Sequence, residues 1–253
     1  MLEPSSAVMD VWRTFDGFPM ETLTKAWLHR RCGGPRQRTV REMAEHRRAF
    51  GTSGNCFDLA IWLLHDLQEA GVRAHAIGHD LFTPQAHVAV LAYDRGQRYL
   101  CDLGDQWIRP VPINVPAGDV AEPLPGYFPG ARIRVAATAD ACVVTYHRAA
   151  GKWSTQSYAL AEVGRDELLR AGQHAQSLLR RPLCEIRVPL AGEVAHWEFD
   201  NWSSRLSTEA ALYAEPPAGS LEAWCARIHR RTGMSPAVVE AALAVYRAVR
   251  QEG

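Results

Sequence analysis

The sequence lacks an excess of either charge and any long apolar run. Its 28 Lys and Arg residues are balanced by 28 Asp and Glu residues. We therefore expect no nucleic acid partner, because polyanions bind to basic surfaces. The longest apolar runs, such as Val88–Tyr93, are far below the roughly 18 residues that span a bilayer. The first residues, Met1 to Pro4, show no apolar secretory signal. These absences predict a cytoplasmic protein with no membrane partner.

No Cys-x-x-Cys pair is present, which disfavours a redox dithiol or a cysteine-rich zinc site. The six cysteines are scattered, and a chain of 253 residues with 47% hydrophobic and 22% charged residues can form a globular core without disulfides. We expect reduced thiols. Internal repeats and low-complexity segments are also absent, and the oligomeric state is left open. The cysteines lie at positions 32, 56, 101, 142, 184 and 225.

The apolar periodicity changes from helical to strand-like near residue 71. Residues 1–70 read as helical, and the Pro-rich stretch 110–129 reads as a loop or strap. After it, strands and helices are mixed, and the last helix begins at Ser235-Pro236, an N-cap followed by a first-turn proline. The predicted strands are 72–78, 87–93, 98–103, 132–137, 141–147, 153–160, 185–189 and 196–199, and the later helices are 161–180 and two near the C-terminus.

Cys56 stands in the first turn of a predicted apolar helix. Asn55 or Ser53 can cap that helix. A helix N-terminus stabilises a thiolate, and its unpaired backbone N–H groups can bind an oxyanion. The alternative is an inert buried cysteine, since cysteine is among the most buried residue types. Cys56 is therefore a candidate nucleophile that needs a base nearby.

His87 and Asp102 can supply that base and its orienting carboxylate. His87 opens one strand of a predicted hairpin, and Asp102 ends the other. They share a sheet face only if the loop between the strands has an even number of residues, such as Arg95-Gly96 or Asp94–Gln97. A three-residue loop with a bulge would place them on opposite faces. The order Cys, His, Asp is that of a catalytic triad.

These motifs resemble those of the arylamine N-acetyltransferase family, within the papain- and transglutaminase-like cysteine superfamily. The family's Arg-Gly-Gly-x-Cys-Phe-Glu corresponds to residues 52–58, Thr-Ser-Gly-Asn-Cys-Phe-Asp. Its His before an apolar strand corresponds to His87, and its Asp-Val-Gly, 15 residues later, to Asp102-Leu103-Gly104. Weaker similarities are Pro19-Met20-Glu21-Thr22-Leu23, Gly151-Lys152-Trp153, Tyr158-Ala159-Leu160 and residues 221–233.

The resemblance implies an α+β fold in three parts with a cysteine-protease-like core. We expect a helical bundle with the nucleophile over 1–70, an antiparallel β-barrel with His87 and Asp102 over 71–165, and an α/β lid over 166–253. It also implies acetyl transfer from acetyl-CoA to a small-molecule amine by a ping-pong route through a Cys56 thioester intermediate. The expected substrate-binding residues are Gly54, Asn55, Phe57, Gly104, Asp105 and Trp107.

At two places the sequence departs from the family's motifs, which limits what the resemblance implies about donor and acceptor binding. Thr52 and Ser53 replace the Arg and first Gly before the nucleophile, and Asp105 stands where an aromatic residue is expected beside the acceptor. We expect Asp105 to favour a cationic or hydrogen-bond-donating acceptor, with Trp107 supplying the aromatic wall from a shifted position. The alternative is that Asp105 points to solvent in a loop. The alternatives left open are a transglutaminase-like thiol hydrolase or peptidase, an amide synthase, and a non-catalytic relative that binds a partner.

A metal site is not expected. His75 and His79 could join Cys56 or His87 as zinc ligands. However, their segment is predicted to be a strand, in which residues i and i+4 are about 13 Å apart. Zinc ligands must converge on one ion, so the spacing disfavours this site.

Overall fold

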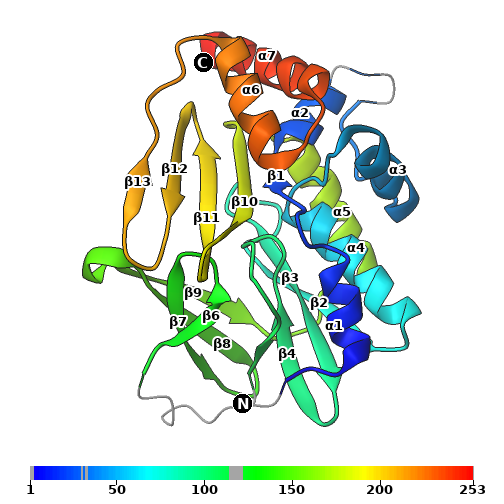
Figure 1. Ribbon diagram of the computed structural model, residues 1–253. Coiled ribbons are helices and arrows are strands. Elements are labelled where there is room, and N and C mark those ends of the chain that lie inside the picture. The colour runs from blue at the N-terminus through cyan, green and yellow to red at the C-terminus, as the bar shows by residue number, and fades with distance from the viewer. Residues whose placement is uncertain (1–2, 30, 32–33, 114–121, 253) are drawn as a thin grey trace.

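The computed structural model describes residues 3–29, 31, 34–113 and 122–252. Within these residues it contains seven α-helices and three antiparallel sheets, so the α+β class is confirmed. Figure 1 shows α1, α3, α4 and α5 along one side, the sheets on the other, and α6 and α7 across one end. Cys32 and part of the Pro-rich stretch lie outside the described residues.

Helix α4 (Cys56–Glu69) is the central helix of the N-terminal part. It packs against α1 (Ser6–Arg13), α3 (Val40–Phe50) and the first four-stranded sheet. Its stripe of Leu59, Leu63 and Leu67 is buried in the larger of two hydrophobic cores, as expected for an amphipathic helix over a sheet. The apolar stripe thereby fixes which face of α4 packs against the sheet.

The first sheet has the order β2-β3-β4-β5 and carries the predicted hairpin. Asp94 pairs with Gln97, so the connection is a two-residue turn. Arg95 and Gly96 both have positive φ (51° and 76°), the signature of a type I′ turn. Of the two loop types that the sequence left open, the even-numbered one is therefore present. The strands are β2 (Arg73–His79), β3 (His87–Asp94), β4 (Gln97–Cys101) and β5 (Val111–Pro112).

The second four-stranded sheet has the order β6-β7-β8-β9. An isolated bridge between Ala76 and Val163 ties β2 to the segment that follows β9. In the described residues the two sheets are separate ladders, so the expected closed barrel is not confirmed. The strands are β6 (Leu124–Phe128), β7 (Ala131–Ala137), β8 (Ala141–His147) and β9 (Trp153–Ala159), with a short 3₁₀ turn at Ala149–Gly151.

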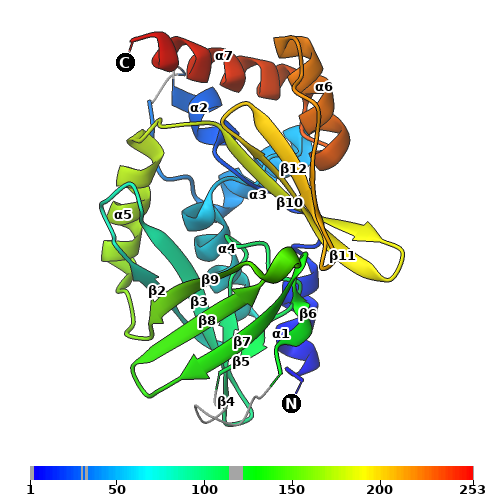
Figure 2. The same cartoon turned by 90° about the vertical axis from the view of Figure 1, so that its left-hand side faces the viewer.

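The C-terminal part is a five-stranded sheet, β1-β10-β11-β12-β13, covered by helices. It lies above the two smaller sheets in both ribbon views (Figures 1 and 2). A second hydrophobic core forms between this sheet, α2, α6 and α7. The helices and strands of the chain after residue 164 are α5 (Arg165–Ser177), β10 (Leu183–Leu190), β11 (Glu193–Asp200), β12 (Ser203–Ser207), β13 (Leu212–Ala214), α6 (Leu221–Thr232) and α7 (Pro236–Glu252).

Two segments of the N-terminal part belong structurally to this C-terminal sheet. Strand β1 (Met20–Glu21) pairs with β10, and α2 (Leu23–His29) packs on α7. The prediction that 1–70 is all helical is therefore wrong at β1, because two residues are too few to show a strand period. The loop prediction for 110–129 is wrong at β5 and β6, which pair despite their prolines. The three-part division at residues 70 and 165 stays a prediction.

None of the helices described is both long and apolar enough to cross a membrane.

Candidate active site

Cys56 is the first residue of α4, as the sequence predicted. Asn55 is the N-cap, and its Oδ1 accepts from the N–H groups of Phe57 and Asp58 at 3.0 and 3.2 Å. The Asp58 carboxylate accepts in return from the Asn55 N–H at 3.2 Å. This capping box fixes the start of the helix, and with it the position of the thiol.

A buried ion pair supports the loop before Cys56. Arg38 and Asp58 lie 3.2 Å apart, with only 2% of each side chain exposed. Arg38 also donates to the carbonyl of Ser53 at 2.9 Å. Gly54 has a φ of 107°, and a Cβ there would lie 2.1 Å from the Asp58 carboxylate. Gly54 is thus required by backbone conformation and by space. Arg38 supplies a guanidinium to a loop that lacks the motif's arginine at position 52.

Glu21 holds the same loop from the other side. Its buried carboxylate accepts from the N–H groups of Ser53 and Gly54 at 3.2 and 2.7 Å. The Glu21 N–H donates to the Gly54 carbonyl at 2.8 Å. Burial raises the pKa of Glu21, opposed by its hydrogen bonds to Thr24. Strand β1 therefore connects the nucleophile loop to the C-terminal sheet, a role that the sequence analysis missed.

His87 and Asp102 lie together on one face of the hairpin. The His87 Nε2 is 2.6 Å from Oδ2 of Asp102, whose residue is 0% exposed. The Tyr158 hydroxyl donates to the same oxygen at 3.0 Å, and the Asp105 N–H donates to Oδ1 at 3.0 Å. A side-chain hydrogen bond with Cys56 is among the influences that raise the pKa of His87, so the thiol lies within reach of the ring. The three residues therefore form a connected Cys-His-Asp arrangement.

The charge state of His87 is set by this arrangement. Burial acts to lower the pKa of His87. The Asp102 carboxylate, with help from Cys56 and Asp105, overrides burial and raises that pKa well above its ordinary value. A protonated His87 stabilises a thiolate beside it, as in other Cys-His pairs. A buried carboxylate in such a contact is the kind of group that orients an imidazole ring and stabilises its protonated form.

Gly104 lies against all three members of the triad. A Cβ at this position would be 2.7 Å from Cβ of Cys56, 3.0 Å from Cε1 of His87 and 3.2 Å from Oδ1 of Asp102. The backbone of residue 104 therefore packs directly against the reacting groups. A side chain of any size would push them apart, which explains the glycine at this position.

Asp105 is partly buried beside the triad. Its Oδ2 accepts from the Tyr146 hydroxyl at 2.8 Å. Desolvation, and then the negative charge of Asp102, raise the pKa of Asp105 to about 6. The carboxyl group is thus mostly ionised at neutral pH at a free-energy cost, since it lies in a partly dry site near a second carboxylate. Tyr146 was not singled out from the sequence, because only the fold brings β8 to this loop.

The triad opens into a cavity of about 320 Å³. Four of the six predicted substrate-binding residues line it: Asn55, Phe57, Gly104 and Asp105. Gly54 does not, because it belongs to the supporting loop. Trp107 does not either: it is 0% exposed and packs edge-on against Phe128 and Tyr146. The expectation that Trp107 forms the acceptor wall is not supported by this position.

Three cations of the cavity were not among the predicted site residues. Lys25, Arg180 and Arg181 line it together with Cys56. Lys25 Nζ donates to the Ala175 carbonyl at 3.1 Å. Burial lowers the pKa of Lys25, and the nearby Cys56 is the largest of the opposing influences. An ammonium close to Cys56 favours the thiolate. Lys25 lies on α2 and Arg180 follows α5, so no local motif joins them.

The donor atoms of His87, Asp102 and Asp105 lie within 4.8 Å of one another, a spacing that a metal ion could use. Both Asp102 oxygens are, however, occupied by donors from His87, Tyr158 and the Asp105 amide. This hydrogen-bond chemistry fits a triad better than a ligand set. The zinc alternative does not assemble either, since His75 faces the Leu160 carbonyl at 3.4 Å and His79 faces Asp80 at 3.0 Å.

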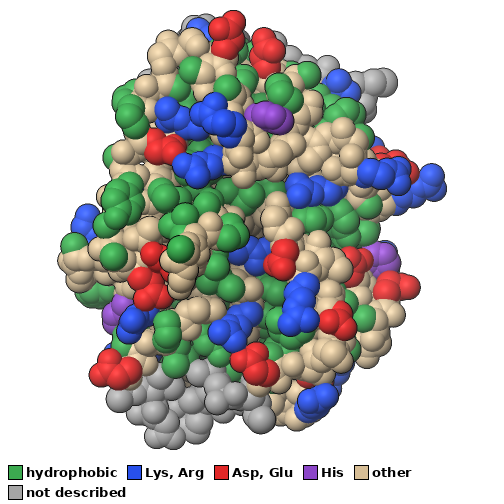
Figure 3. Space-filling view, viewed as in Figure 1, with side chains coloured by type: hydrophobic (Ala, Val, Ile, Leu, Met, Phe, Trp, Pro, Cys, Tyr) green, Lys and Arg blue, Asp and Glu red, His purple; other side chains and the backbone are tan. Residues whose placement is uncertain are grey.

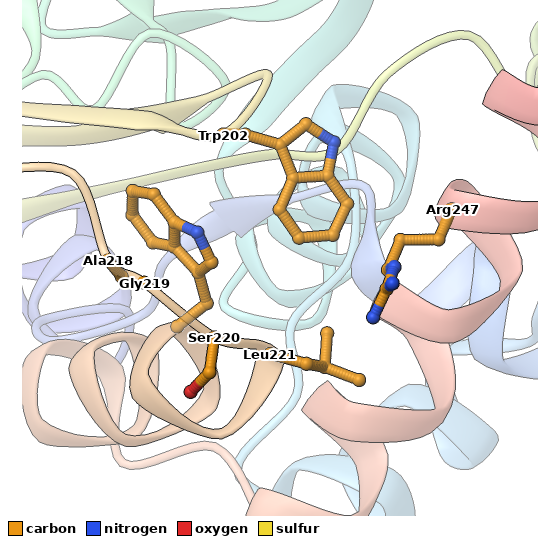
Figure 4. A pocket seen from close by; sticks show the side chains of 7 residues that line it. Trp202, Ala218, Gly219, Ser220, Leu221 and Arg247 are labelled. Carbon is orange, nitrogen blue, oxygen red and sulfur yellow. The ribbon is translucent and has the colours of Figure 1, made fainter.

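Another cavity, of about 450 Å³, lies beside α6 and α7. Figure 4 shows Trp202, Leu221 and Arg247 around it, and none of the predicted site residues lines it. On the face of Figure 1, basic and acidic side chains are interspersed (Figure 3), as the zero net charge leads one to expect. Among the described residues, the cavity at Cys56 combines a concave shape with a cysteine and a histidine in contact, and is the candidate active site.

No protein-family model matches the sequence, and no curated protein matches it in sequence. Solved structures do match. The arylamine N-acetyltransferase of Salmonella typhimurium is 12% identical, with a TM-score of 0.71, over 98% of this chain and 94% of that one. The Mycobacterium marinum enzyme in complex with CoA is 14% identical, with a TM-score of 0.68, over 92% and 90%.

A third match is the Bacillus cereus arylamine N-acetyltransferase, described as having a Cys-His-Glu catalytic triad. It is 14% identical, with a TM-score of 0.62, over 93% of this chain and 92% of that one. At these identities the likeness concerns the fold. The resemblance first indicated by the motifs is thereby confirmed at that level: this chain has, over nearly its whole length, the fold of the arylamine N-acetyltransferases.

Proposed function

We propose that this protein transfers an acyl group, most simply acetyl, from a coenzyme A thioester to an amine through a covalent Cys56 intermediate. The single observation that carries this proposal is the Cys56-His87-Asp102 arrangement at the cavity. A thiol at a helix N-terminus, a histidine in hydrogen-bond contact with it and a buried orienting carboxylate are the parts that nucleophilic acyl transfer needs. The shared fold supports the same chemistry.

In the first half-reaction the Cys56 thiolate attacks the thioester carbonyl. The new bond joins sulfur to the acyl carbon, and the bond from that carbon to the coenzyme sulfur breaks. The departing coenzyme thiolate takes the proton from the His87 imidazolium. Because one thioester replaces another, the step is nearly isoenergetic, which suits cysteine better than serine.

The oxyanion formed in this step needs a hydrogen-bond donor close to Cys56. Asn55 Oδ1 already occupies the N–H groups of Phe57 and Asp58. The N–H of Cys56 itself is therefore the donor of the first turn that remains for the oxyanion. The capping box thus restricts the oxyanion site to the start of the helix.

In the second half-reaction an amine attacks the Cys56 thioester. A bond forms from nitrogen to the acyl carbon, the carbon–sulfur bond breaks, and His87 takes the proton that nitrogen loses. Acylation removes the hydrogen bond to the Cys56 side chain, one of the influences that raise the pKa of His87, so the ring is more readily held in its neutral form and can accept a proton. Asp102 keeps the ring oriented throughout.

Acetyl-CoA is proposed as the donor because a protein of the same fold has been solved with CoA. The cavity here offers Lys25, Arg180 and Arg181 for the anionic parts of such a donor.

The experiment that tests this function is the release of free CoA from acetyl-CoA with and without an aromatic amine. We expect release to require the amine and to disappear in Cys56→Ser, with Cys225→Ser as the matched control because Cys225 lies in the other core. Release at the same rate without any amine would instead indicate a thiol hydrolase. No release under either condition would contradict the proposal.

A further inference from the structure

Two cavities meet at Asp105 and Glu185. The first, of about 320 Å³, contains the triad. The second, of about 340 Å³, lies between the β6–β9 sheet and the C-terminal sheet and is lined by Tyr146, His196 and Arg205, among others. Asp105 and Glu185 line both cavities. A molecule bound at Cys56 therefore shares its cavity with these two carboxylates. The place where Asp105 and Glu185 lie between the two cavities is the neck.

Neither carboxylate forms an ion pair with a Lys or Arg side chain of the described residues, and His87, which acts on Asp105 electrostatically, is itself bound to Asp102. Asp105 has the Tyr146 hydroxyl as its side-chain partner, at 2.8 Å. Glu185 has the His196 ring, whose Nε2 lies 3.6 Å from Oε2, too far for a hydrogen bond. The two guanidinium groups that line the second cavity have other partners: Arg205 pairs with Glu198, and Arg148 lies over the rings of Phe128 and Tyr146.

His196 gives an independent sign that a ligand belongs here. The residue is only 6% exposed, yet its Nε2 has no hydrogen-bond partner in the structure. It lines the second cavity and points toward the Glu185 carboxylate. A buried polar atom left unpaired costs free energy, and such groups commonly mark a place that a ligand completes.

A cation is the ligand chemistry that this neck would take. Two carboxylates in a partly dry site repel each other, and a positive group between them removes that repulsion. The donor atoms of Asp105 and His87 lie within 4.8 Å of each other. The cation must therefore be close to the atom that reacts, and it must belong to a small acceptor rather than to the coenzyme.

The two nitrogens of such an acceptor must differ in basicity. The attacking nitrogen has to be uncharged, because a protonated amine has no lone pair for the thioester. An aliphatic amine is protonated at neutral pH, and carboxylates next to it keep it so. An aromatic amine is uncharged under the same conditions. One molecule that carries both meets the requirements of Cys56 and of the two carboxylates.

We propose that the acceptor is an aromatic amine with a second, protonated aliphatic amine, which Asp105 and Glu185 bind at the neck between the cavities. This inference rests on the proposed function for the attack itself. The aromatic nitrogen is acylated as described above, its proton passing to His87. The aliphatic ammonium forms charge-assisted hydrogen bonds to the two carboxylates and remains unreacted.

The test compares 4-(aminomethyl)aniline with 4-(hydroxymethyl)aniline, which has the same shape without the second charge. We expect kcat/KM to favour the aminomethyl compound by about 10- to 100-fold, with the acetyl group on the aromatic nitrogen. Asp105→Asn with Glu185→Gln should bring the ratio of the two kcat/KM values close to one, whatever the overall rate of this variant. Glu240→Gln, an exposed acid on α7, is the matched control and should keep the preference.

Failure of this inference and failure of the proposed function give different results. Equal kcat/KM for the two anilines, or acylation of the aliphatic nitrogen, would overturn the inference while acyl transfer itself stands. If no amine is acylated, calorimetry with Cys56→Ala protein measures binding alone. Tighter binding of the aminomethyl compound, lost in Asp105→Asn with Glu185→Gln, would still support the cation site. Equal binding would overturn it.

Discussion

Gly104 packs so closely against Cys56 that a Cβ on residue 104 would lie 2.7 Å from Cβ of the nucleophile. The glycine is on the loop that follows the triad Asp102, and the cysteine is on α4, so this contact fixes the distance between the helix and the hairpin. The geometry of the triad therefore depends on the absence of one side-chain atom.

Substitution Gly104→Ala is expected to displace the triad while the fold persists. A displacement of about 1 Å at reacting groups can cost about 100-fold in rate, and we expect a loss of that order in single-turnover acylation by acetyl-CoA. Gly219→Ala is the control, since a Cβ there would meet nothing within 4 Å. Acylation by Gly104→Ala at the wild-type rate would show that the contact does not position the triad.

Substitution Asp102→Asn should preserve the shape of the site and remove most of its activity. The amide cannot stabilise imidazolium and can present the wrong partner to the ring, and in serine triads such a change costs about 10⁴-fold. The measurement is kcat/KM for acetyl transfer, with circular dichroism to confirm folding. Near-normal turnover of a folded Asp102→Asn variant would remove Asp102 from the mechanism.

Iodoacetamide should modify Cys56 before the other described cysteines. Cys56 is partly exposed, whereas Cys101, Cys142, Cys184 and Cys225 are buried. Burial raises the pKa of each of these four thiols, that of Cys142 to about 12. Peptide mass spectrometry after brief labelling at neutral pH checks the order. Equal labelling of Cys56 and Cys225 would count against an activated nucleophile.

Lys25 should contribute to that reactivity. Its ammonium and the Cys56 thiolate attract each other, so removing the charge should disfavour the thiolate. We expect Lys25→Met to slow alkylation of Cys56 by about three- to tenfold, an effect that corresponds to roughly 1 kcal/mol of electrostatic attraction. The exposed Lys152→Met is the matched control. An unchanged alkylation rate in Lys25→Met would mean that this cation does not act on the thiol.

Asp105 should destabilise the folded protein at neutral pH. Its pKa is raised to about 6 from an ordinary 3.8, so the folded state holds its proton more tightly than the unfolded state. The tighter binding of the proton stabilises the folded state in full below pH 3.8, and this stabilisation is lost as the pH rises through 6. Asp105→Asn should therefore be more stable than wild type at pH 7.5, by roughly 1–3 kcal/mol.

Urea unfolding of wild type and Asp105→Asn at pH 7.5 and at pH 4 measures this difference, which should shrink at the lower pH. A variant that is less stable than wild type at pH 7.5 would contradict the account of an unneutralised carboxylate. The expected gain in stability on losing a charged group is typical of sites where function is favoured over stability.

The sequence was sufficient for the parts of the site that local rules determine. Asn55 next to Cys56 is a helix-capping pattern, and the type I′ turn at Arg95-Gly96 places His87 and Asp102 on one face. These rules act within a few residues or across one hairpin. They therefore predicted the order of Cys56, His87 and Asp102 along these elements, and the loop length, which the sequence left open, decided that His87 and Asp102 share a face.

The supporting contacts could not be predicted in the same way, because they join segments far apart in the chain. Glu21 binds the loop at Gly54 through a two-residue strand that has no detectable period. Arg38 reaches the same loop from the segment before α3. Strands β12 and β13 were missed entirely, and Trp107 was expected in the pocket but is in the core. Each depends on how the sheets pack, which apolar periodicity does not specify.

The covalent Cys56 intermediate is the central claim, and intact mass spectrometry tests it most directly. The protein is mixed with acetyl-CoA, its mass is recorded, and an aromatic amine is then added. We predict a gain of one acetyl group that is absent in Cys56→Ser, is retained in Cys225→Ser and disappears when the amine is added. An unchanged mass with acetyl-CoA, or an acetyl group that the amine does not remove, would contradict the account.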